Sequence, residues 1–106
     1  APCSPLSIKK NPYTGEYFAV WNPISPSVTV ERDWSFQRTP LVIARSNNGV
    51  DFSYPEIIEN AENAGYCYPA LYFLSEREAV MSYCAGERFN GDVSCLVRTR
   101  IIKLEL

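Results

Sequence analysis

Residues 38–52 read Arg-Thr-Pro-Leu-Val-Ile-Ala-Arg-Ser-Asn-Asn-Gly-Val-Asp-Phe. The apolar run over residues 41–46 is rich in the residue types that favour strands. It runs into Asn47-Asn48-Gly49, and asparagine and glycine tolerate the positive φ that tight hairpin turns require. The stretch therefore predicts a strand, a hairpin turn and a returning strand.

The same combination recurs on both sides of this stretch. Apolar runs of four to eight residues alternate with polar turns, and no segment has a convincing helical period. The predicted strands are residues 6–9, 17–22, 41–46, 54–58, 68–74, 79–84, 94–98 and 101–106. The predicted turns include residues 11–15, residues 75–77 and Asn90-Gly91. The sequence thus predicts an all-β fold.

One long segment interrupts this rhythm. Residues 22–40 contain Pro23, Pro26 and Pro40 and show alternation only around residues 28–30. A long surface loop on a β scaffold often contains functional residues, because its side chains do not have to pack in the core.

Composition excludes several functional classes. The chain has 106 residues, one domain by length, with a net charge of −2 and no histidine. The absence of a basic surplus argues against nucleic acid as a partner. No apolar run reaches the roughly 20 residues of a membrane span.

Without histidine there is no Ser-His-Asp triad and no imidazole ligand for zinc, so we expect no metal and no cofactor. The sequence indicates no compartment.

The four cysteines, Cys3, Cys67, Cys84 and Cys95, form no C-x-x-C pair. This spacing argues against a zinc ribbon or a thioredoxin-type site. Three of them lie in or beside apolar runs, so we expect buried thiols rather than a disulfide framework.

The chain also repeats weakly, which suggests two similar units at about residues 1–60 and 66–106. Residues 3–8 align with 67–72, residues 17–21 with 79–83, and residues 41–45 with 96–100. Two four-stranded antiparallel units are typical of propeller blades. Two blades alone leave large apolar faces bare, so they require either further blades or association, such as three copies closing a six-bladed ring. A small eight-stranded β-sandwich is the alternative that needs no partner.

Three segments resemble a known superfamily when taken in order: residues 38–44, 46–52 and 65–71. They are similar to the C-terminal part of the sialidase-like, BNR-repeat (Asp-box) glycoside hydrolases, which are six-bladed propellers. The resemblance covers nearly the whole chain, as two blades of six. Residues 46–52 resemble a degenerate Asp box, which usually lies between the third and fourth strands of a blade. Asn48 replaces the aspartate, the turn is one residue short, and Phe52 replaces the tryptophan.

The resemblance implies roles for two residues. Arg38 matches an arginine that grips the substrate carboxylate, and a guanidinium binds a carboxylate through two parallel hydrogen bonds. Tyr66 matches the catalytic tyrosine, and sialidases are exceptions to the rule of two catalytic carboxylates. The family's base glutamate, its acid/base aspartate and its other two arginines come from earlier blades and match nothing here. We therefore expect the isolated chain not to hydrolyse sugars.

Each candidate also has a structural alternative. Arg38 can be a loop arginine paired with Glu31 or Asp33, and Tyr66 can be a packing residue with a hydrogen-bonded hydroxyl. Other residues are assigned from their position alone. Tyr68 is a second tyrosine that can face the central axis of the propeller, and Trp34 and Phe36 are candidates for a platform on which a sugar ring stacks. Trp21 is expected in the core. The acidic residues Glu56, Glu59 and Glu62 are expected on a solvated edge.

The sequence therefore predicts a segment of a sialidase-like glycoside hydrolase that binds carbohydrate. Two alternatives stay open. One is a lectin-like module of two blades that completes a propeller as a trimer, and the other is a purely structural β-domain.

Overall fold

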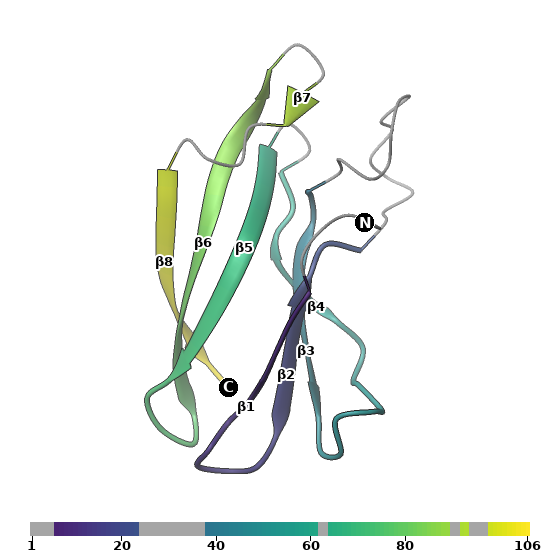
Figure 1. Cartoon of the computed structure of the whole chain (residues 1–106), viewed down its shortest axis with the longest axis vertical. Coiled ribbons are helices and arrows are strands. Elements are labelled where there is room, and N and C mark those ends of the chain that lie inside the picture. Colours follow the sequence, from purple (N-terminus) through teal and green to yellow (C-terminus); the bar gives the residue numbers. More distant parts are fainter. Residues whose placement is uncertain (1–5, 24–37, 62–63, 90–91, 94–97) are drawn as a thin grey trace.

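The computed structural model describes residues 6–23, 38–61, 64–89, 92–93 and 98–106, and these form two antiparallel sheets (Figure 1). The first sheet has the order β1 (Ser7–Lys10), β2 (Tyr17–Trp21), β3 (Leu41–Ser46) and β4 (Glu56–Glu59). The second contains β5 (Ala64–Phe73), β6 (Glu78–Phe89) and β8 (Arg98–Glu105), and β7 (Asp92–Val93) pairs with the far end of β6. These described residues include no helix, so the predicted all-β class is confirmed, and within them no helix is long and apolar enough to cross a membrane.

The second sheet differs from the four-stranded unit expected from the sequence. It consists of three long strands, because the 12-residue β6 pairs with β5 on one side and directly with β8 on the other. The last strand was expected at residues 101–106 and begins earlier, at Arg98. Of the strand expected at residues 94–98, all but Arg98 lies outside the described residues. The first sheet thus contains four strands, and the second contains three long strands together with the two-residue β7.

The connections between the strands lie at two opposite ends of the sheets (Figure 1). At one end are the connections of four to nine residues that join β1 to β2, β3 to β4, and β5 to β6, which we call the short turns. Asn11 Nδ2 donates a hydrogen bond of 3.5 Å to Ser75 O, which ties the first of these turns to the third. At the opposite end the chain leaves β2 at Trp21 and enters β3 at Leu41, and it leaves β4 at Glu59 and enters β5 at Ala64.

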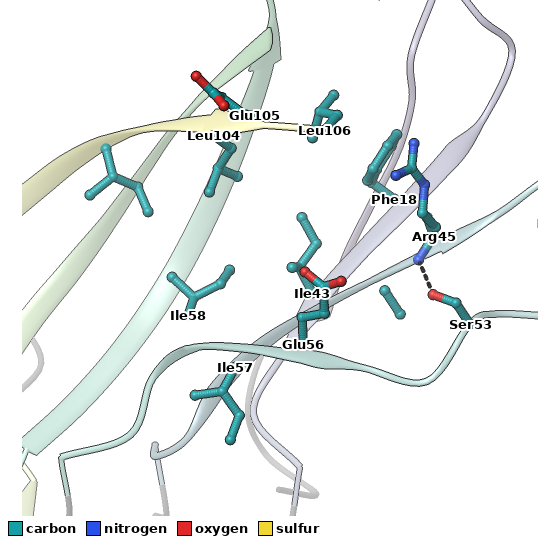
Figure 2. A pocket seen from close by; sticks show the side chains of 12 residues that line it. Phe18, Ile43, Arg45, Ser53, Glu56, Ile57, Ile58, Leu104, Glu105 and Leu106 are labelled. Carbon is teal, nitrogen blue, oxygen red and sulfur yellow. Dashed lines mark hydrogen bonds between the residues drawn. The ribbon is translucent and has the colours of Figure 1, made fainter. Parts of the chain in front are cut away.

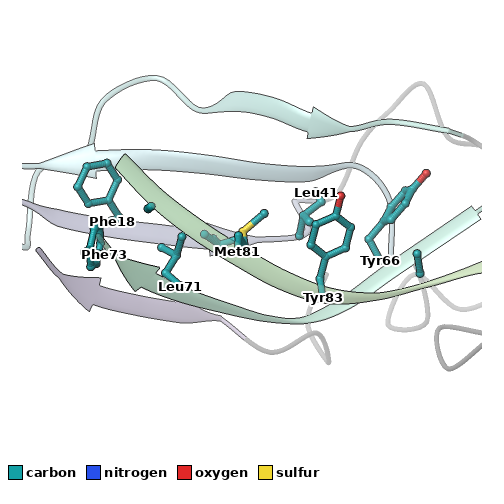
Figure 3. Close-up of a cluster of buried hydrophobic side chains, with 10 residues drawn as sticks. Phe18, Leu41, Tyr66, Leu71, Phe73, Met81 and Tyr83 are labelled. Atoms are coloured by element: carbon teal, nitrogen blue, oxygen red, sulfur yellow. The ribbon is translucent and has the colours of Figure 1, made fainter. Parts of the chain in front are cut away.

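One core fills the space between the facing sides of the sheets (Figure 3). Phe18 of β2 meets Phe73 of β5 with ring centroids 5.3 Å apart. Leu41 of β3 and Met81 of β6 are each 0% exposed. Lys9 Nζ also crosses between the sheets, donating to the backbone carbonyl of Leu71 at 2.7 Å. Because the apolar side chains of each sheet are buried against those of the other, the two sheets stabilise each other.

The predicted turn after β3 is held by its own side chains. Asn48 Oδ1 accepts the backbone N–H groups of Val50 and Asp51, both at 2.8 Å. Ser46 Oγ accepts the N–H groups of Asn48, at 3.2 Å, and Gly49, at 2.9 Å. Gly49 has a φ of 77°, in the left-handed region that glycine adopts without strain. Asn48 therefore holds the turn through its amide oxygen, which accepts two backbone N–H groups.

We expect Asn48→Ala to lower the free energy of unfolding by about 1–2 kcal/mol, because two backbone donors lose their acceptor. Asn48→Asp keeps that acceptor and is expected to cost less. The exposed neighbour provides the control, since Asn47→Ala should change stability by less than about 0.5 kcal/mol. Urea unfolding of the three variants measures these differences, and an equal cost for both alanine variants would contradict the role of Asn48.

Candidate functional site

Arg38 and Tyr66 lie side by side at the end of the sheets opposite the short turns. The backbone N–H of Tyr66, near the start of β5, donates a hydrogen bond of 2.8 Å to the carbonyl oxygen of Arg38, just before β3. This bond joins the two sheets. The structure thus brings together the two residues that sequence resemblance had linked, although 27 positions separate Arg38 from Tyr66 in the chain.

The backbone around Arg38 is fixed by buried polar side chains. Asn22 Nδ2 donates to the carbonyl oxygens of Arg38, at 3.0 Å, and Pro40, at 2.9 Å. Thr39 Oγ1 donates to the carbonyl oxygen of Ala61 at 3.0 Å. Asn22 is 1% exposed and Thr39 is 0% exposed, so the donor side chains of all three hydrogen bonds are buried. Arg38 itself is half-buried, and its carbonyl oxygen accepts hydrogen bonds from both Asn22 and Tyr66.

The Tyr66 ring is buried inside this end of the core. It is 4% exposed and packs edge-on against Tyr83, with ring centroids 6.1 Å apart (Figure 3). Burial raises the pKa of the Tyr66 phenol, and the negative charge of Glu59 raises it further, while Arg100 acts in the opposite direction. The phenol is therefore neutral at physiological pH.

Glu59 is the charged centre of this region. Its Oε2 accepts a hydrogen bond of 2.6 Å from the Tyr83 hydroxyl, and the same oxygen accepts one from Arg100 Nη1. Burial, followed by the hydrogen bond and the charge of Glu59, raises the pKa of Tyr83 to about 12. The hydrogen bond to Glu59 also raises the pKa of Arg100. We call Glu59, Tyr66, Tyr83 and Arg100 the Glu59 cluster: two neutral phenols around a carboxylate that is partly neutralised by a guanidinium.

Sequence reasoning missed this role of Glu59. Glu56 is exposed, as expected of a solvated edge, but the Glu59 side chain is only 19% exposed. The cause is a register shift in the pairing of β3 with β4, which sets Glu59 opposite the buried Leu41. Because a bulge changes the face to which a strand residue points, alternation along the sequence could not reveal it. Glu62 lies outside the described residues.

The other predicted site residues are not part of the Glu59 cluster. Tyr68 is 60% exposed, and its φ of 56° lies in a register shift of β5 that turns it away from the buried Tyr66. Trp34 and Phe36 lie outside the described residues, as do the suggested partners of Arg38, Glu31 and Asp33. Trp21, expected in the core, is half-buried.

A separate cleft of about 350 Å³ opens between β3, β4 and the end of β8 (Figure 2). Its lining combines aliphatic side chains, such as Ile43, Ile58 and Leu104, with the charged side chains of Arg45, Glu56 and Glu105. The cleft does not include Arg38 or Tyr66, the two residues to which the sequence resemblance implies roles in a site.

Among the described residues, no group of three or more acidic or cysteine side chains is arranged to bind a metal ion. No protein-family model, curated protein or solved structure matches the chain. The functional assignment therefore depends on the geometry of the chain's own residues.

Proposed function

We propose that the chain forms two adjacent blades of a sialidase-like β-propeller and contributes Arg38 to a site for an acidic carbohydrate. The observation that carries this proposal is the hydrogen bond from Tyr66 N–H to the Arg38 carbonyl. It places both residues at the end of the sheets that holds the 19-residue connection between β2 and β3, and functional loops of β scaffolds lie on such ends.

The arrangement of the sheets supports the propeller part of the proposal. Each sheet is built from consecutive strands, and the two sheets pack face to face. The turn that resembles an Asp box joins the third strand to the fourth, as in the family, and lies at the end away from Arg38. Where they are described, segments aligned by the sequence repeat overlap equivalent strands: residues 7–8 with 71–72 on β1 and β5, and residues 17–21 with 79–83 on β2 and β6.

The chemistry of the site favours binding over hydrolysis by this chain alone. A guanidinium on a fixed backbone is suited to hold the carboxylate of an acidic sugar. Tyr66, by contrast, is buried against Tyr83 and neutral, so its hydroxyl is not presented to a substrate. We propose that Tyr66 positions Arg38, and that hydrolysis requires residues from other blades.

Titration with N-acetylneuraminic acid, followed by NMR chemical shifts, tests this assignment. We expect saturable binding that weakens about tenfold or more in Arg38→Ala, because a hydrogen-bonded charge is lost. Arg45→Ala is the matched control, since Arg45 is exposed, pairs with Glu16 and lies beside the short turns. Turnover of an aryl sialoside should stay at the level of buffer. Equal binding by Arg38→Ala and wild type would exclude Arg38 from the site.

A second candidate function is a glycan-binding module that completes a propeller by trimerisation. It is favoured by apolar side chains on the outer side of both sheets: Ile57 is 61% exposed on β4, and Tyr72 and Ile101 are 67% and 69% exposed on β5 and β8. Exposed apolar patches of this kind mark association surfaces. Light scattering on the sample used for the titration separates the two proposals, because a trimer has three times the mass of the 12.0 kDa chain.

A further inference from the structure

Two cysteines stand directly opposite each other on neighbouring strands. Cys67 of β5 pairs with Cys84 of β6 in the antiparallel register. Both are thiols in the structure, Cys67 buried and Cys84 half-buried. Their neighbours Tyr66 and Tyr83 point into the core, and alternation places the two thiols together on the other face of the sheet.

This placement is suited to a covalent bond between them. Residues directly opposed in an antiparallel pair have Cα atoms about 4.5 or 5.5 Å apart, depending on the hydrogen-bonding pattern. Disulfides span Cα separations of about 4.4–6.8 Å, so either pattern is compatible. Opposed side chains also point in the same direction, which brings the two sulfur atoms toward each other.

We infer that Cys67 and Cys84 form a modification site that is oxidised to a cross-strand disulfide by a small disulfide such as oxidised glutathione. The half-buried Cys84, as a thiolate, attacks one glutathione sulfur and releases one glutathione thiolate. Cys67 then loses its proton and attacks the Cys84 sulfur, which releases the second glutathione. Two protein thiols and one glutathione disulfide thus become one protein disulfide and two reduced glutathione molecules.

The position of the bond gives it a structural consequence. The pair lies next to the register shift at which Cys67 faces Cys84 and Ala70 faces Ser82. It also directly precedes Tyr68, with its left-handed φ of 56°. A cross-link here fixes β5 to β6 beside the buried rings of Tyr66 and Tyr83. This modification does not depend on the proposed carbohydrate function.

Peptide mapping tests the inference on the intact chain. Cleavage after lysine and arginine puts the four cysteines in four different peptides, residues 1–9, 46–77, 78–88 and 89–98. After incubation with oxidised glutathione and quenching with an alkylating agent, we expect residues 46–77 linked to 78–88. The chain should lose two hydrogens in mass, and its Tm should rise by roughly 10 °C.

Cys84→Ser and the double variant Cys3→Ser/Cys95→Ser serve as controls. The first should abolish the linked peptide and the rise in Tm, whereas the second should keep both. A stable mixed disulfide of Cys84 with glutathione, a dominant link to Cys3 or Cys95, or unreacted thiols at Cys67 and Cys84 would overturn the inference. Reduction by dithiothreitol should return the wild-type chain to its original Tm.

Discussion

Replacing Met81 by alanine is expected to lower the free energy of unfolding by about 3 kcal/mol. Met81 is 0% exposed and lies on β6, between β5 and β8, with its side chain in the core shared by both sheets. Truncating a buried methionine removes its transfer free energy and leaves a cavity, at a combined cost of about 2–5 kcal/mol. Urea unfolding followed by tryptophan fluorescence measures the change.

Ile101→Ala provides the matched control for Met81→Ala. Ile101 is 69% exposed and lies on β8 next to Ile102, the register partner of Met81. Its truncation removes a similar amount of apolar surface from the outer side of the same sheet, and we expect a cost below about 1 kcal/mol. Similar costs for the two variants would contradict a single core between the sheets.

Raising the pH from below 10 to above 12 is expected to destabilise the protein by about 3 kcal/mol through Tyr83 alone. Its pKa in the folded chain is raised to about 12, against an ordinary tyrosine value of 10 in the unfolded chain. The unfolded state therefore releases this proton at a lower pH than the folded state does. The stabilisation is complete below pH 10 and is lost between pH 10 and 12, at about 1.4 kcal/mol per unit. The pKa of Tyr66 is raised as well, so its contribution has the same sign.

Urea unfolding at several pH values, with tyrosinate absorbance recorded in parallel, measures this loss. Tyr83→Phe should be less stable than wild type at neutral pH, because Glu59 loses a hydrogen bond. Its stability should also fall less steeply between pH 10 and 12. Tyr72→Phe, which changes an exposed ring on β5, should retain the wild-type pH dependence. If Tyr83→Phe retained the wild-type pH dependence, the pKa of Tyr83 would not be raised in the folded chain.

Much of the fold could be predicted from local sequence patterns. The run over residues 41–46 matches β3 exactly in extent, and Asn48 and Gly49 form the turn that follows it. These features depend on residues close together in the chain, where strand preference and turn chemistry act directly. The extent of β5 and β6 was underestimated, because polar residues such as Glu78 are paired in the sheet although their composition does not favour strands.

The candidate site was only partly predictable, because its contacts join residues that are far apart in the chain. Arg38 and Tyr66 were identified by resemblance, and their roles stay a prediction; the structure shows a backbone hydrogen bond between them. The contacts of Glu59 with Tyr83 and Arg100 join residues from three separate strands. They depend on a register shift in β4, and no pattern within a single strand records how it is aligned with its neighbour.

The consecutive order of the strands also bears on how the chain folds. Most strand pairs are formed by neighbours in the sequence, and β6 reaches β8 past only the two-residue β7. Most contacts nevertheless join residues far apart in the chain, as in other all-β folds, and such contacts slow folding because chain entropy is lost before they form. The widest gap between paired strands separates β2 from β3. Closing that gap and docking the two finished sheets are therefore the steps expected to limit the folding rate.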